Sequence, residues 1–117
     1  MTAGETYATM FRRWSLGVVI VAMNKLGVIN HVRLTCAACR AEGLSMHAVV
    51  LNQPEHADRD SSIDDNPSVI AELEDLPVVV LPWLAGGYDV DRAASAVEAS
   101  GLADRLLAPT DHPTTIV

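Results

Sequence analysis

The sequence is poor in aromatic residues and in positive charge. Aromatic side chains make up 4% of the 117 residues, with a single phenylalanine. Fifteen acidic residues outnumber eight basic ones, so the net charge is −7, and no basic run occurs. Nucleic-acid binding depends on basic surfaces that neutralise phosphates, often with aromatic side chains that stack on bases. We therefore do not expect this chain to bind nucleic acid.

Long hydrophobic runs are also missing. The longest uninterrupted apolar run, residues 16–23, is too short to span a bilayer. The N-terminus is acidic and polar and then amphipathic, which differs from a signal peptide. We expect no membrane association, a cytoplasmic location and, at this length, one domain at most.

Only two cysteines occur, Cys36 and Cys39, in the order Cys-Ala-Ala-Cys. A redox pair with this spacing sits at the start of a helix, where the helix dipole lowers the pKa of a thiol. This pair lies about two turns into a predicted helix. Neither a second cysteine pair nor a histidine pair with zinc-ligand spacing is present. We expect two small buried thiols and no metal site.

The most informative stretch is residues 17–31. It opens with an uncharged, β-branched run over residues 18–22, which is typical of a strand buried on both faces. A polar turn with Gly27 follows, and then a helical pattern with one apolar face: Val28, Ile29, Val32, Cys36 and Cys39. Such a turn leaves free N–H groups at the carboxyl end of a strand, where α/β sheets bind ligands and helix N-termini favour anions. Most turns of this kind bind nothing, so the geometry alone does not decide whether this turn binds a ligand.

Strands and helices alternate along the rest of the chain. Further strands are predicted over 46–51 and 78–81, and helices over 3–14, 28–42, from Asp65 or Asn66 to 74, from Asp89 or Asp91 to 100, and over 102–107. This alternation predicts an α/β fold, a parallel sheet in a three-layer arrangement with about three strands and four to five helices. We expect residues 1–108 to form one domain and residues 109–117 a tail. The polar residues 52–66 are expected to form a solvated, flexible loop.

Three segments together resemble the dethiobiotin synthetase family. The first is a K-L-G-x-I-N-H string that follows a strand and opens a helix: Lys25-Leu26-Gly27-Val28-Ile29-Asn30-His31. Two others match in order and at about the right spacing: Val49-Val50-Leu51-Asn52, and Leu76-Pro77 leading into Leu81-Pro82-Trp83-Leu84. The resemblance covers roughly residues 7–85. It implies a partial P-loop-NTPase-like fold that corresponds to the C-terminal half of these enzymes.

The resemblance also implies a function. Dethiobiotin synthetases are homodimers that use CO₂ and MgATP to carboxylate diaminopelargonic acid and close its ring in biotin synthesis. By resemblance, one loop binds the substrate carboxylate across the dimer: Lys25, Leu26, Gly27, Val28, Ile29 and Asn30. Asn52 hydrogen-bonds the adenine, since an amide offers both a donor and an acceptor, and the adenine pocket is lined by Pro82, Trp83 and Leu84. Taken alone, Asn52 also fits a strand-end turn residue, and Pro82 a strand terminator.

The sequence departs from the family in one large respect. It contains no G-x-x-x-x-G-K-[ST] string, which cradles phosphates and Mg²⁺. The P-loop, another catalytic lysine and a magnesium-binding acid lie in the family's N-terminal half. ATP and Mg²⁺ are therefore implied as cofactors although this chain lacks their phosphate and metal ligands, and we assign no catalytic residue.

Two hypotheses follow from this departure. In the first, the chain is the C-terminal part of a synthetase and is catalytic only when an N-terminal P-loop part is supplied by the same gene or another chain. Its expected partner is a second copy in a homodimer or this missing N-terminal half. In the second, it is a non-catalytic remnant domain that binds a nucleotide, a small carboxylate or a protein partner. An adapted remnant is expected to be a stable monomer or defined oligomer, whereas an isolated half leaves a sheet edge exposed.

Overall fold

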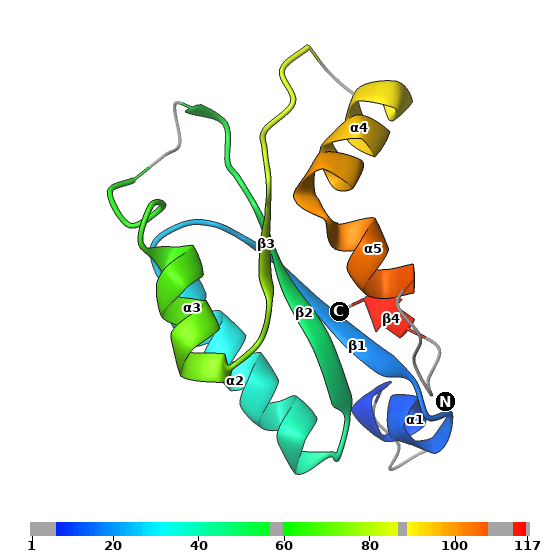
Figure 1. The fold of residues 1–117 in the computed structure, drawn as a ribbon. Coiled ribbons are helices and arrows are strands. Elements are labelled where there is room, and N and C mark those ends of the chain that lie inside the picture. Colours follow the sequence, from blue (N-terminus) through cyan, green and yellow to red (C-terminus); the bar gives the residue numbers. More distant parts are fainter. Residues whose placement is uncertain (1–6, 57–59, 87–88, 108–113, 117) are drawn as a thin grey trace.

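The computed structural model describes residues 7–56, 60–86, 89–107 and 114–116 of the chain. Its centre is a parallel sheet of four strands in the order β3-β2-β1-β4 (Figure 1). The strands are β1 (Gly17–Met23), β2 (Ser45–Asn52), β3 (Val78–Leu81) and β4 (Thr114–Ile116). The helices are α1 (Tyr7–Arg13), α2 (Val28–Ala41), α3 (Asn66–Glu74), α4 (Val90–Ser100) and α5 (Leu102–Leu107).

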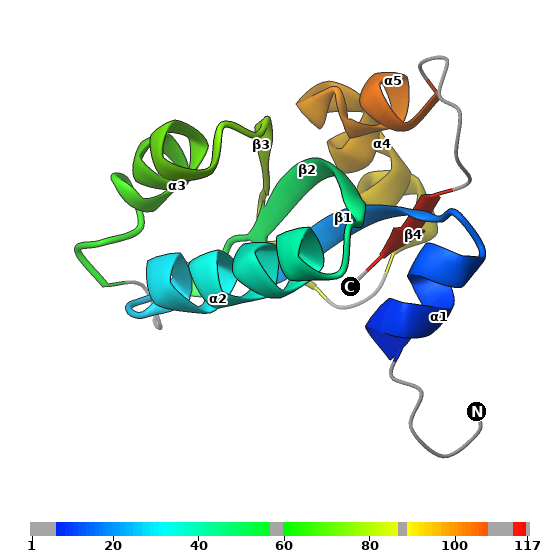
Figure 2. The same ribbon diagram turned by 90° about the horizontal axis from the view of Figure 1, so that it is seen from below.

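Helices cover both faces of the sheet. α2 and α3 pack side by side on one face, and α4 and α5 lie on the other (Figure 2). α1 lies near the end of the sheet at which β1 begins (Figure 1). The three-layer α/β architecture with a parallel sheet, expected from the alternation of strand and helix patterns, is confirmed.

The fourth strand corrects the expectation for the C-terminal segment. β4 falls within residues 109–117, which the sequence analysis takes for a tail, and it pairs with the first three residues of β1. A three-residue strand is too short for hydrophobic periodicity to reveal. The rest of the predicted tail, residues 109–113 and 117, lies outside the described residues, as do residues 3–6 of the first predicted helix.

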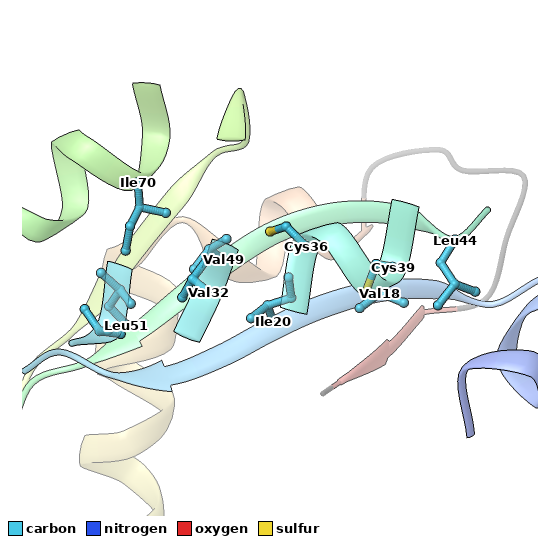
Figure 3. Packing of buried hydrophobic residues seen from close by; sticks show 10 residues of the cluster. Val18, Ile20, Val32, Cys36, Cys39, Leu44, Val49, Leu51 and Ile70 are labelled. Carbon is cyan, nitrogen blue, oxygen red and sulfur yellow. The ribbon is translucent and has the colours of Figure 1, made fainter. Parts of the chain in front are cut away.

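β1 and β2 are buried on both faces, which explains their nearly continuous hydrophobic sequences. On the face towards α2 and α3, alternate residues of these strands pack against the two helices (Figure 3). This cluster contains Val18, Ile20, Val28, Val32, Cys36, Cys39, Leu44, Val49, Leu51 and Ile70. On the opposite face, Val19, Val50 and Val79 form a smaller cluster.

Cys36 and Cys39 are free thiols buried on the inner face of α2, as the sequence predicts. Burial, together with the nearby Glu74 carboxylate, raises the pKa of Cys36 to about 11. Burial also raises the pKa of Cys39. Both thiols are therefore protonated at neutral pH, whereas a reactive redox cysteine needs a lowered pKa.

The first helix ends earlier than the sequence suggests. Gly17 was expected to close it, but α1 ends at Arg13 and the turn contains Ser15 with a left-handed φ of 55°. Gly17 instead begins β1, where an added Cβ atom would collide with the imidazole of His47 on β2. The glycine thus leaves room for the His47 imidazole and does not end a helix.

The boundaries of α4 agree with the sequence, but its inner face does not. The Asp89 carboxylate caps the helix by accepting hydrogen bonds from the backbone N–H groups of Asp91 and Arg92, at 3.0 and 3.2 Å. Gly101 ends the helix in a left-handed conformation with φ 78°. The apolar spacing of this segment predicts Val90 on the inner face, but its side chain is 61% exposed.

Two arginines of α2 converge on one buried carboxylate of α3. The seven-residue spacing of Arg33 and Arg40 predicts one solvated face, and their side chains are indeed 58% and 50% exposed. Both nevertheless reach Glu74, whose side chain is 4% exposed. Arg40 Nη1 lies 2.6 Å from Glu74 Oε2, and its Nη2 donates to the Glu74 carbonyl oxygen at 2.9 Å. Arg33 Nε lies 3.6 Å from Glu74 Oε1. The sequence gives no sign of this pairing because the partners are 34 or more residues apart.

We predict that Arg40→Ala lowers the free energy of unfolding, because it leaves the buried Glu74 carboxylate without its closest cation. Urea unfolding followed by circular dichroism measures the change. Arg33→Ala is the matched control on the same helix. Its longer, more exposed contact with Glu74 should be worth less than about 1 kcal/mol. Equal losses in the two variants would contradict this account.

Candidate site at the carboxyl ends of the strands

The loops that follow β1, β2 and β3 begin side by side. In the parallel register Met23 pairs with Asn52, and Asn52 pairs with Leu81, so the three strands end together. Two backbone hydrogen bonds continue this alignment beyond the strands. Asn24 N–H donates to the Asn52 carbonyl at 2.8 Å, and Gln53 N–H donates to the Leu81 carbonyl at 2.8 Å. This edge is where open α/β sheets bind their ligands.

A cavity of about 320 Å³ opens at this edge, and each of the three strand ends contributes to its wall. It is lined by Met23, Lys25, Pro54, Glu55 and Trp83. Small-molecule sites typically measure roughly 300–1,000 Å³, so the cavity lies at the small end of that range. An ammonium group, a carboxylate and a half-exposed indole therefore share one hollow.

The structure brings the two predicted ligand segments together through Lys25 and Trp83. Lys25 comes from the loop predicted to bind a carboxylate, and Trp83 comes from the segment predicted to line an adenine pocket. Asn52 ends β2, half-buried, two residues before the cavity-lining Pro54. Pro82 and Leu84 flank Trp83 in the loop after β3. These residues thus lie at one end of the sheet, as the resemblance implies.

In the turn formed by residues 25–30, the groups that could contact a ligand are mainly backbone N–H groups. Gly27 adopts φ 90° as the residue before α2, a conformation that strongly favours glycine. The Val28 side chain is buried in the core, and its N–H donates to the Lys25 carbonyl at 3.1 Å. Ile29 is half-buried, whereas Leu26 and Asn30 are exposed. Within the described part of the chain, the N–H groups of Gly27, Ile29 and Asn30 have no hydrogen-bond partner and remain available to a ligand.

Residues 60–66 hold this turn in place, and sequence reasoning missed them. They were expected to be part of a flexible loop, but Ile63 is 4% exposed, and Asp60 Oδ2 accepts a hydrogen bond from Leu26 N–H at 2.8 Å. Asn66, at the start of α3, is 3% exposed and bonds to the fully buried Asn24. A single isoleucine among polar residues was the one available signal. Residues 57–59 of the same loop lie outside the described residues.

A family model described as an AAA domain matches residues 1–86. The chain belongs to this AAA-domain family. The match covers every residue predicted here to bind a ligand, from Lys25 to Leu84, and the strands β1, β2 and β3 that place them.

Curated relatives of this AAA-domain chain are ATP-dependent dethiobiotin synthetases. That of Anaeromyxobacter sp. strain K is 39% identical over 84 residues, which are 71% of this chain and 37% of the relative. The Anaeromyxobacter dehalogenans 2CP-C protein is 37% identical over 98 residues (83% and 42%), and the Aquifex aeolicus VF5 protein is 34% identical over 102 residues (87% and 43%). The resemblance to dethiobiotin synthetases is confirmed, and the chain spans about two fifths of the length of these relatives. No solved structure matches it significantly.

Among the described residues, no group of three or more histidine, cysteine, aspartate or glutamate side chains is placed to hold a metal ion. In the same part of the chain, no helix is long and apolar enough to cross a membrane.

We predict that Asp60 gives the turn an acid-sensitive contact. Hydrogen bonds from the Ser62 hydroxyl, the Ser62 N–H and the Leu26 N–H lower the pKa of Asp60. A lowered folded-state pKa means that the contact is fully present above the unfolded value, about 3.9, and is lost as the pH falls through the folded value. In an NMR titration, the Leu26 amide shift should follow a midpoint below about 3.9. Asp60→Asn should abolish this titration, and a midpoint at or above 3.9 in the unsubstituted chain would contradict the contact.

Proposed function

We propose that this chain supplies the adenine-binding and substrate-carboxylate-binding part of an ATP-dependent dethiobiotin synthetase. One observation carries the proposal. A single cavity is lined by Lys25 from the loop that resembles the family's carboxylate loop and by Trp83 from the segment that resembles its adenine pocket. The names of the relatives support the same activity. The proposed substrate is diaminopelargonic acid, and the proposed location is the cytoplasm.

The carboxylate of the substrate would bind at the start of α2. The Lys25 ammonium group and the available N–H groups of Gly27, Ile29 and Asn30 offer positive charge and donors at a helix N-terminus, where anions are stabilised. The exposed Asn30 side chain adds a further donor, and the exposed Leu26 side chain offers an apolar contact. Val28 would not contact the carboxylate with its side chain, which is buried in the core, or with its N–H, which donates to the Lys25 carbonyl. It would instead anchor the start of α2 to the core.

The adenine would bind at the ends of β2 and β3. The Asn52 side chain offers one donor and one acceptor, which the edge of an adenine requires. Trp83, 50% exposed at the cavity, offers an aromatic face against which a purine can stack. Pro82 and Leu84 would shape the loop that carries this indole. The residues at this edge of the sheet therefore fit the adenine base of ATP. ATP is the phosphoryl donor of the proposed synthetase.

Phosphate and Mg²⁺ binding would come from a P-loop-bearing N-terminal half, and the carboxylate loop would act across a homodimer. The edge of β1 could pair with a strand of the N-terminal half. β4 pairs with residues 17–19 only, and among the described residues no strand pairs with this edge at residues 20–23. A groove of about 270 Å³ runs there, lined by Ile20, Val21, Ala22, Met23, His31, Val32 and Thr35. An added parallel strand would satisfy the open backbone groups and cover these side chains.

We predict that AMP and diaminopelargonic acid bind independently to this chain, and that separate substitutions weaken the binding of each. Trp14→Phe leaves Trp83 as the only tryptophan. In that background, AMP should quench indole fluorescence saturably and GMP should not. Asn52→Ala should weaken AMP binding about tenfold, since a buried base edge loses its hydrogen bonds.

Asn30→Ala is the reciprocal control. It should weaken the binding of diaminopelargonic acid, measured by calorimetry, and leave AMP binding unchanged. If AMP and GMP quench alike, or if each variant weakens both ligands equally, the assignment of the two subsites is wrong. If neither ligand binds, the proposed function of the isolated chain is wrong.

We predict that catalysis appears only when a P-loop is supplied. The chain is mixed with the N-terminal part of the Aquifex aeolicus synthetase, and ADP release is measured. ADP should form only with both parts and with diaminopelargonic acid present, because phosphoryl transfer depends on charge neutralisation at the phosphates. Lys25→Ala is the control variant and should lower this activity. If the two parts bind each other without ADP release, the chain is a non-catalytic remnant.

A further inference from the structure

The side chain of Asn24 is completely buried directly after β1, although asparagine is usually exposed. Burying an amide is costly unless its hydrogen bonds are satisfied. Here Nδ2 donates to Gln53 Oε1 at 2.9 Å and to the Ile63 carbonyl at 3.0 Å. Oδ1 accepts from Asn66 Nδ2 at 2.9 Å. One side chain therefore joins the ends of β1 and β2 to the segment that precedes α3.

Asn66 continues this network towards the ligand loop. Its Nδ2 lies within hydrogen-bond distance of the Lys25 carbonyl at 3.3 Å and of Ser62 Oγ at 3.2 Å, besides Asn24 Oδ1. The residue after Lys25 is held as well, because Leu26 N–H donates to Asp60 Oδ2. The peptide group between Lys25 and Leu26 is thus held at both its carbonyl and its N–H by residues 60–66.

The network reaches both proposed ligand subsites. Gln53 follows Asn52 on the adenine side, and the Asn24 N–H donates to the Asn52 carbonyl at 2.8 Å. Lys25 and Leu26 begin the carboxylate loop. Both polar atoms of the buried Asn24 amide are paired. This favours one arrangement of the loop, since another would leave these atoms unpaired in the interior.

We infer that Asn24 and Asn66 are positioning residues that hold the loop from Lys25 to Gly27 in its ligand-binding conformation against the end of β2. Neither side chain lines the cavity, so both act through the backbone of the loop. This inference rests on the proposed function for its ligand. Its structural part, the control of the loop by Asn66, stands on the hydrogen bonds alone.

The test is Asn66→Ala, with Ser68→Ala as the matched control in the same turn of α3. The exposed Ser68 hydroxyl bonds only to the nearby Asp65 carbonyl, at 3.0 Å. Asn66→Ala should weaken the binding of diaminopelargonic acid about tenfold or more, because a small displacement of a positioned group costs much of its effect. AMP affinity should change less than about twofold, since Asn52 stays paired in the sheet. Ser68→Ala should change neither affinity.

A purely structural role would leave the two affinities of the folded protein unchanged, or would lower both equally, and either result overturns the inference. Should Asn66→Ala fail to fold, Asn66→Ser keeps a polar donor at the start of α3 but places it one bond closer to the backbone, short of the Lys25 carbonyl and Asn24 Oδ1, and should show the same selective loss. A measurement without ligand separates this inference from the proposed function. In ¹⁵N spectra, Asn66→Ala should shift the Leu26 and Gly27 amide signals, and Ser68→Ala should not. Unmoved signals refute the positioning role, whereas shifted signals in a chain that binds neither ligand refute only the proposed function.

Discussion

The pairing of β1 with β2 is the constraint on which the rest of the structure depends. Seven residues of each strand pair, from Gly17↔Ser45 to Met23↔Asn52, with one irregularity between Val18 and Val19 that skips His47. Both strands are buried on both faces. A slip by one residue would turn each buried side chain to the opposite face of the sheet. It would also separate Asn24 from the carbonyl of Asn52. The same register that closes the core therefore decides which strand ends meet at the cavity.

The parts of this fold that the sequence predicted depend on local pattern. The β-branched runs gave β1 and β2, Gly101 gave the end of α4, and the apolar spacing gave the buried face of α2. What the sequence did not reveal depended on distant partners. The spacing of Arg33 and Arg40 correctly indicated a solvated side, but not their contact with the buried Glu74, which belongs to another helix. β4 exists only through its pairing with β1.

Three polar residues in the interior explain why the candidate site was only partly predictable. Asn24, Asn66 and Glu74 are at most 5% exposed, and each is paired with a residue far away in the sequence. Such residues are usually exposed, so composition and periodicity assign them to the surface. Lys25 and Trp83 could be assigned because a segment resembling a known family carries each of them. Asn66 lay in a polar stretch without such a motif, and only the fold reveals its contact with the Lys25 loop.

In the proposed synthetase, binding of the adenine and the carboxylate needs less positive charge than phosphoryl transfer does. The cavity contains one cation and one anion, Lys25 and Glu55, on a chain whose net charge is −7. An adenine ring is neutral and binds through stacking and its polar edge, so this charge balance suits it. Transfer of a phosphoryl group instead needs cations concentrated around the phosphates. The carboxylate loop needs less positive charge, since Lys25 and the free N–H groups at the start of α2 would bind a single carboxylate. In the proposed enzyme, this chain would recognise the adenine and the carboxylate, and the P-loop-bearing half would supply the charge needed for catalysis.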